Sequence, residues 1–175
     1  MTNSSSEPVG RPAAAPLCDL GLLIKDVVDA HRLSPEANVR HVDQDLPSHP
    51  LLVRGHGEDV ASLVAAAIEC VARWPGVNRR IVVRARLIFE RVELLVGHGN
   101  SKGGDPPLPI TLSELGSDGD PVYVSLRGRM MRLLRTLNAT LVLGWDVALD
   151  ALVLSIVFPG ISGGPTYRSY RPVSG

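Results

Sequence analysis

The stretch EDVASLVAAAIECVARW, from Glu58 to Trp74, decides how the rest of the chain is interpreted. Its apolar residues recur at three- and four-residue spacing, which predicts an amphipathic helix ended by the Pro75-Gly76 pair. The residues of its buried face are Val60, Leu63, Val64, Ala67, Ile68 and Val71. Near the end of this helix lies the carboxylate of Glu69, three residues after Ala66 and directly before Cys70.

The length and composition indicate one soluble domain. A chain of 175 residues, 45% apolar and 21% charged, is long enough for one hydrophobic core. The formal net charge is zero, which excludes a bulk attraction to nucleic acid or to an anionic membrane. Of the 18 cations only Lys25 and Lys102 are lysines, and the remaining 16 are arginines. Arginine is suited to protein interfaces because it presents a planar fork of donors.

Cysteine usage indicates a cytoplasmic protein. Cys18 and Cys70 lie in apolar stretches without metal-ligand spacing, so we expect two reduced, buried thiols and no metal site. We expect neither export nor membrane insertion, since no signal-like start and no continuous apolar run of about 20 residues is present.

The pattern outside the Glu58–Trp74 helix predicts two polar tails around a mixed domain. Residues 1–16 are rich in Ser, Pro and Ala, residues 160–175 are rich in Gly and Pro, and both tails are expected to be flexible. Before that helix we predict a helix from Leu17 to between His31 and Ser34, with Asp19 as N-cap, and the strands Val39–Asp43 and Leu51–Arg54. After it we predict a hairpin of Arg80–Phe89 with Val92–Val96, and then a long loop from Gly97 to Pro121 that contains one helical turn at Leu112–Leu115. The last predicted elements are the helix Val124–Leu137 and the strands Thr140–Val147 and Ala151–Phe158. The inner face of the last helix is expected to carry Leu126, Met130, Leu133, Leu134 and Leu137.

Four short matches accompany this order of elements. They are Asp19-Leu20 opening the first helix, Leu46-Pro47 before the second strand, Leu52-Val53-Arg54-Gly55 leading into the second helix, and Val157-Phe158-Pro159 closing the last strand. With them, residues 17–159 resemble the catalytic domain of sensor histidine kinases, of the GHKL superfamily that also includes gyrase and mismatch-repair ATPases. The resemblance implies an α+β fold, a Bergerat-like two-layer α/β sandwich with three helices on one face of a mixed, largely antiparallel sheet. We expect the dimerisation and phosphoacceptor hairpin to be lacking, since 16 residues are too few to form it.

The resemblance also implies where nucleotide would be held, and these positions are degenerate. Glu69 matches the family's glutamate, whereas Ala66 and Cys70 replace its two asparagines. His98, or Gly97 with a slip of one residue, replaces the aspartate that would bond adenine. The glycine-rich phosphate cradle is replaced by Val124-Ser125-Leu126-Arg127-Gly128. We therefore expect no bound cofactor and no catalysis, with Glu69 as a vestige.

The sheet face without helices is the first candidate for a partner surface. In this superfamily that face is partly open, and its outward positions mix aliphatic side chains with arginines. The candidates are Arg80, Val82, Arg84, Arg86, Leu95, Val142, Val153 and Val157. The alternative is a cross-strand pair of Arg84 or Arg86 with Glu93.

A second candidate surface is basic. It consists of Arg127, Arg129, Arg132 and Arg135 on the outer half of the last helix. Such a stripe suits phosphates of nucleic acid or a carboxylate-rich protein surface, and the alternative is a solvated helix face.

The favoured interpretation is a non-catalytic pseudo-ATPase that acts as a protein–protein interaction module in bacterial regulation or assembly. Its partner would be a signalling or cytoskeletal component, or a second copy in a homodimer. The alternatives are an atypical ATP-binding serine kinase of the anti-sigma type, a phosphotransfer adaptor, and a nucleic-acid binder that uses the arginines of the last helix.

Overall fold

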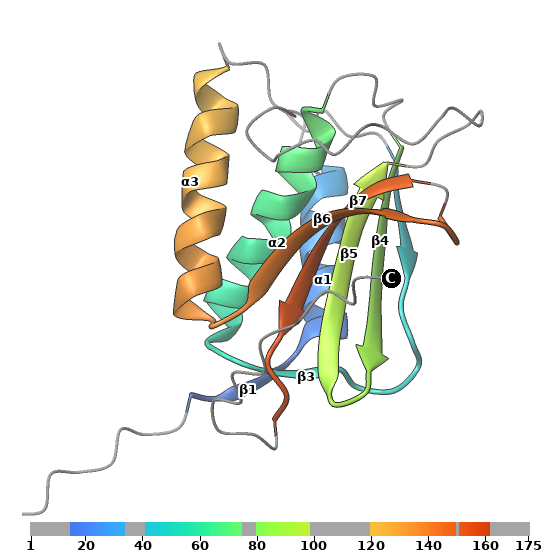
Figure 1. The fold of residues 1–175 in the computed structure, drawn as a ribbon, viewed down its shortest axis with the longest axis vertical. Helices are drawn as coiled ribbons and strands as arrows, with labels where there is room; N and C mark the ends of the chain where they lie inside the picture. The colour runs from blue at the N-terminus through green and yellow to red at the C-terminus, as the bar shows by residue number, and fades with distance from the viewer. Residues whose placement is uncertain (1–14, 34–40, 75–79, 99–119, 150, 162–175) are drawn as a thin grey trace, which may run out of the picture.

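The computed structural model describes residues 15–33, 41–74, 80–98, 120–149 and 151–161. Along the chain the elements are β1 (Leu17–Asp19), α1 (Leu20–Leu33), β2 (His41–Asp45), β3 (Leu52–Arg54), α2 (Gly57–Ala72), β4 (Arg80–Ile88), β5 (Arg91–His98), α3 (Pro121–Thr136), β6 (Thr140–Asp146) and β7 (Ala151–Phe158). Figure 1 shows the helices lying side by side on one face of the larger sheet. The predicted α+β sandwich is therefore confirmed.

The larger sheet has the strand order β2-β4-β5-β7-β6. β2 runs parallel to β4, and the other neighbours are antiparallel. The two hairpins β4–β5 and β6–β7 thus supply four of its strands, while the parallel β2 is connected to β4 by a crossover that contains α2. β1 and β3 form a separate antiparallel pair in which Cys18 opposes Val53.

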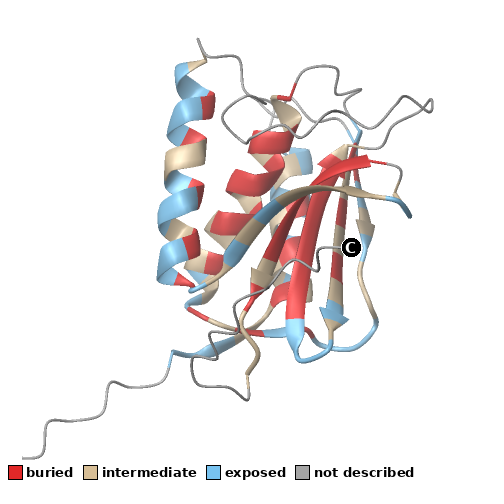
Figure 2. Ribbon diagram, viewed as in Figure 1, coloured by how far each residue is buried: buried red, intermediate tan, exposed pale blue. Residues whose placement is uncertain are grey.

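The hydrophobic core lies between the sheet and the helices. Figure 2 shows buried residues along β5, β7 and the sheet-facing side of α2. The six residues predicted for the buried face of α2 are all fully buried. Four of the five predicted on α3 are buried and Leu133 is half-buried, so both helix faces are confirmed. In β4 the alternation also holds, except that Leu87 is 54% exposed near the end of the strand.

Asp19 determines where α1 begins. One oxygen of its carboxylate, Oδ1, accepts from the backbone N–H of Gly21 at 2.9 Å and from that of Leu51 at 3.3 Å. The first bond is an N-cap, as predicted, and the second ties the helix start to the chain ahead of β3. Among the helices of the described chain, none is long and apolar enough to cross a membrane.

Gly55 forms the connection from β3 to α2. Its φ is +147°, and an added Cβ would lie 2.3 Å from a methyl carbon of Leu137. Its backbone N–H donates to the carbonyl of Pro16 at 2.8 Å. A side chain would be strained here both by the backbone conformation and by the close approach of α3's end.

Several predicted boundaries were wrong. Residues Leu17–Asp19 are a strand and not the first turn of α1, because they pair with β3. β2 spans His41–Asp45, whereas the predicted strand was Val39–Asp43; its bounds follow from its pairing with β4. β5 continues to His98, two residues further than expected, because β4 offers partners up to Ile81.

Some predictions fall outside the described residues. These are the tail before residue 15, the Pro75-Gly76 stop, most of the loop with its helical turn at 112–115, and the tail from residue 162. They stay predictions.

Candidate functional site

The degenerate nucleotide positions meet where the second half of α2 faces the start of α3. Ala66 and Cys70, one helical turn apart on α2, are both buried, and Glu69 beside them is half-buried. The helical spacing places the three residues on one side of α2, where Ala66 and Cys70 contribute a methyl group and a thiol.

The electrostatics of Cys70 keep it neutral. Burial, and to a smaller extent the neighbouring Glu69 carboxylate, raise the pKa of its thiol to about 12, although Arg73 and Arg127 act in the opposite direction. A thiol with this pKa is protonated at neutral pH and is a poor nucleophile and metal ligand. The prediction of a buried thiol at this position is confirmed.

Two aromatic residues fill the region next to Cys70. Trp74 follows the end of α2, Tyr123 lies in the first turn of α3, and both are buried. His98, at the end of β5, meets Trp74 edge to face with ring centroids 6.2 Å apart. Burial lowers the pKa of His98 and raises that of Tyr123, which favours the neutral form of each.

An ion pair fastens the end of α2 to the start of α3. Arg73 Nη1 lies 2.8 Å from Asp120 Oδ2. Partial burial would raise the pKa of Asp120, but backbone N–H groups of Tyr123 and Val122 and the Arg73 side chain hold it below its ordinary value. Asp120 is thus both the N-cap of α3, with Pro121 after it, and a link between the two helices.

The segment Val124–Gly128, which replaces the family's glycine-rich phosphate cradle, lies inside α3 and not at its start as predicted. α3 begins at Pro121, three residues before the predicted start, because Asp120 caps it. Gly128 therefore lies in the second turn of the helix, where backbone N–H groups are used within the helix. It is no position for holding an anion.

The donor atoms near Ala66 and Cys70 bear on whether a magnesium ion could be held here. Magnesium prefers oxygen ligands, and at the two asparagine positions Ala66 and Cys70 provide none. Within the described ranges, no group of three or more His, Cys, Asp or Glu side chains is placed to hold a metal ion.

The side chains of the candidate partner face differ in exposure, and some of those expected to be outward and accessible are buried. Leu95 and Val153 are buried in a small cluster with Ala151, against which Leu149 packs. Val142 is 52% exposed, and Val82 and Val157 are half-buried. The accessible part of this face therefore lies towards β4 and β6.

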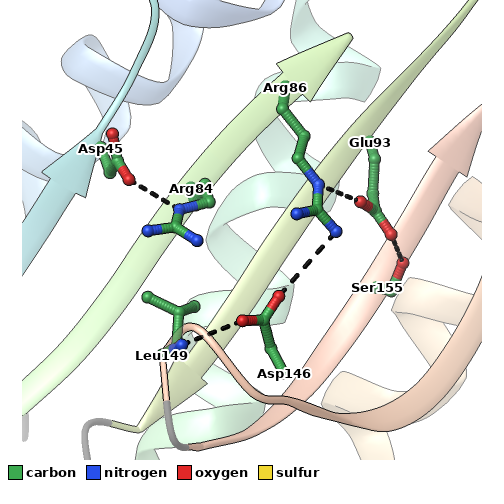
Figure 3. Close-up of polar contacts among 7 residues, drawn as sticks. All are labelled: Asp45, Arg84, Arg86, Glu93, Asp146, Leu149 and Ser155. Carbon is green, nitrogen blue, oxygen red and sulfur yellow. Dashed lines mark hydrogen bonds and ion pairs between the residues drawn. The ribbon is translucent and has the colours of Figure 1, made fainter. Parts of the chain in front are cut away.

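Charged side chains on the same face are paired (Figure 3). Arg86 Nε donates to Glu93 Oε2 at 2.7 Å, and Ser155 donates to the other oxygen of Glu93. Arg84 Nε donates to Asp45 at 2.6 Å. The alternative of a cross-strand pair with Glu93 is thus correct for Arg86, while Arg84 and Arg80 pair with carboxylates of β2.

The α3 arginines differ from those of the sheet. Arg129 donates to the hydroxyl of Ser62 on α2 at 3.2 Å, and Arg127 lies close enough to Cys70 to influence its pKa. Among the residues that the structure describes, no carboxylate forms an ion pair with any of the four.

Sequence reasoning missed Trp74, Tyr123 and Asp146. Tyr123 continues the apolar stripe of α3 at three and seven residues before Leu126 and Met130, so the helical period could have found it. Asp146, 3.8 Å from Arg86, is placed by the pairing of β6 with β7, which no local pattern reveals.

Three solved structures illustrate the likeness to known proteins. The ATP binding domain of PrrB from Mycobacterium tuberculosis matches with a TM-score of 0.57 at 18% identity, over 86% of this chain and 99% of that one. The histidine kinase domain of the E. coli osmosensor EnvZ matches with a TM-score of 0.54 at 18% identity, over 95% of this chain and 99% of that one. The mycobacterial sensor histidine kinase MprB matches with a TM-score of 0.53 at 16% identity, over 83% of this chain and 97% of that one. No protein-family model and no curated protein matches the sequence.

At these identities the likeness concerns the fold, and function has to be argued from the site. The helices on one face, the mixed sheet and the coverage of nearly whole domains agree with the resemblance drawn from the sequence. The chain has the fold of histidine kinase catalytic domains.

Proposed function

We propose that this domain is a non-catalytic relative in fold of the histidine kinase ATPases, which uses the scaffold to bind another protein. The observation that carries the proposal is the pair Ala66 and Cys70. Both are buried at the asparagine positions, and neither side chain carries an oxygen atom. The half-buried Glu69 between them has lost the amides with which it would hold nucleotide and magnesium.

The neighbouring side chains support the same conclusion. Trp74 and Tyr123 occupy the space beside Cys70 with two large buried rings, and His98 packs on Trp74 where an aspartate would bond adenine. The side chains of Cys70, His98 and Tyr123 each favour the neutral form. A triphosphate with its magnesium ion would have to be desolvated against apolar surface, which is strongly unfavourable.

The test is a calorimetric titration of the folded protein with ATP and magnesium. We expect no binding heat and no rise in melting temperature at saturating nucleotide. The double variant Ala66→Asn with Cys70→Asn, which restores both amides, serves as the matched comparison. Micromolar affinity of the wild type would overturn the proposal and favour the ATP-binding serine kinase of the anti-sigma type.

Protein binding is assigned to the accessible part of the open sheet face. There the partly exposed Arg84 and Arg86 lie beside the aliphatic Val82, a combination that suits a protein interface. Affinity capture with the native protein and with Arg84→Glu tests this surface, and Arg32→Glu on α1 is the control. Loss of one dominant partner with Arg84→Glu alone is expected, and equal capture by all three would contradict it.

A second candidate, nucleic-acid binding, is favoured by one observation: the α3 arginines have no carboxylate partner in the described part of the chain. Binding of this kind weakens steeply with salt. A DNA mobility shift at low salt that Arg132→Ala with Arg135→Ala abolishes would support it. No shift at low salt would remove it.

A further inference from the structure

The two edges of the five-stranded sheet are unlike each other. β2 and β6 are the outer strands, and within the described residues β6 pairs with β7 alone. On β2 the exposed residues are His41, Asp43 and Asp45. β6 carries no charge and no proline from Thr140 to Trp145. Charges and prolines on an edge strand prevent pairing with another chain, so β2 is protected and β6 is not.

We propose that β6 pairs antiparallel with β6 of a second copy of this chain, which makes one continuous sheet across a homodimer. This inference rests on the proposed function as a protein-binding module and names a partner for it. The edge strand supplies unpaired backbone donors and acceptors, and the second copy supplies the matching row.

The symmetry of such a dimer fixes the possible registers. A two-fold axis perpendicular to the sheet keeps the helices of both copies on the same side. Directly opposed residues in an antiparallel pair point to the same face, so the axis must lie midway between one residue and the same residue of the second copy. Full overlap of Thr140–Asp146 places the axis at Leu143. Leu143 then opposes Leu143 of the second copy.

The side chains suit this register on both faces. On the open face Val142, which is 52% exposed, would oppose Gly144 of the second copy. A Cβ added at Gly144 would meet nothing within 4 Å, so there is room for the valine. On the helix face the half-buried Leu141 would oppose Trp145 of the second copy. Both contacts bury apolar surface that the single chain leaves partly exposed.

The charges also favour β6 over β2. Asp146 would oppose the neutral Thr140 of the second copy, and it already lies 3.8 Å from Arg86. The same operation on β2, with the axis at the middle of His41–Asp45, would place Asp43 against Asp43. Like charges directly opposed across strands are destabilising.

The outer side of α3 supports the same interface. α3 is the outermost helix on the side of the sheet that β6 borders (Figure 1). Arg129 reaches Ser62 of α2, and Val124 and Met131 lie about 140–160° around the helix from Arg129. Val124 is 49% and Met131 is 39% exposed. Apolar side chains thus extend the interface into the helix layer.

The experiment measures the solution mass by light scattering after size exclusion, with and without charges at the two opposed positions. The wild type is expected to have the mass of two chains and to dissociate on dilution. Val142→Glu with Gly144→Glu, and separately Val142→Lys with Gly144→Lys, are expected to have the mass of one chain, because like charges meet twice in the interface. A mixture of the two variants is expected to restore the mass of two chains. His41→Lys on β2 is the control and is expected to leave the dimer intact.

Circular dichroism verifies that each variant is folded. The solution mass of the wild type tests the dimer independently of any variant. A mass of one chain at every concentration would overturn it, and so would a dimer that persists in both charge variants. Failure here leaves the nucleotide titration untouched: a monomer that binds no ATP contradicts only the homodimer, whereas a dimer that binds ATP contradicts only the non-catalytic assignment.

Discussion

Arg86 on β4 lies directly opposite Glu93 on β5, and its Nε donates to Glu93 Oε2 at 2.7 Å. The Glu93 side chain is only 11% exposed, and its two oxygens accept from Arg86 and from the hydroxyl of Ser155. Asp146 approaches the same guanidinium from β6. Arg86 therefore links carboxylates from two strands on the face that carries no helix (Figure 3).

Removal of Arg86 should destabilise the sheet. We expect Arg86→Ala to lower the free energy of unfolding by about 1–2 kcal/mol, because Glu93 is left nearly buried with a single hydroxyl partner. The measurement is equilibrium unfolding in urea. Arg80→Ala, which removes the exposed pair with Asp43, should cost less than about 1 kcal/mol. Equal losses would show that the burial of Glu93 is unimportant.

Alkaline pH should destabilise the domain through Cys70. Burial raises its pKa to about 12 in the folded state, against 9.0 for an unperturbed thiol. Between these values the unfolded chain has released the proton and the folded one keeps it, so stability falls as pH rises, by about 1.4 kcal/mol per pH unit. Urea unfolding at several pH values should show a shallower fall for Cys70→Ala. Cys18→Ala, the control, should retain the contribution of Cys70.

Mild acid should destabilise the domain through His98. Burial lowers its pKa below the ordinary 6.5, so the unfolded chain takes up a proton at a pH at which the folded one does not. Stability is therefore lost as pH falls through the region below 6.5. His98→Phe keeps an aromatic ring against Trp74 and should reduce this dependence. An unchanged acid profile in thermal unfolding would contradict the assignment.

A side chain at Gly55 should not be tolerated. Gly55→Ala is expected to lower the free energy of unfolding by about 1–3 kcal/mol, since φ is +147° and the new Cβ would collide with Leu137. Gly144→Ala is the matched control, because open space surrounds that position. Its stability should equal or exceed that of the wild type. Similar losses at both glycines would contradict this explanation, because the lower entropy of the unfolded chain favours alanine at both positions and strain is expected only at Gly55.

Periodicity alone predicted the parts of the fold in which local pattern and burial coincide. The buried faces of α2 and α3 follow from residues three and four apart, and the alternation from Ile81 to Ala85 gives the inward face of β4. The substituted positions Ala66 and Cys70 were also visible in the sequence. Each of these inferences needs only neighbours within one element.

Other features depended on contacts far apart in the chain. Leu17–Asp19 is a strand because β3 pairs with it, and α3 starts at Pro121 because Asp120 both caps it and meets Arg73. The rings of Trp74, His98 and Tyr123 come together only because α2, β5 and α3 converge.

The sequence by itself determined the fold class and the placement of Ala66 and Cys70 one turn apart on α2, because side-chain chemistry and helical period are local properties. Only the tertiary structure decided that Leu95 and Val153 are buried, that Arg86 pairs with Glu93, and that β6 is an outer strand of the sheet among the described residues. The physical reason is that burial, ion pairing and strand neighbours depend on which segments the fold brings together, and a single strand carries no record of its partner.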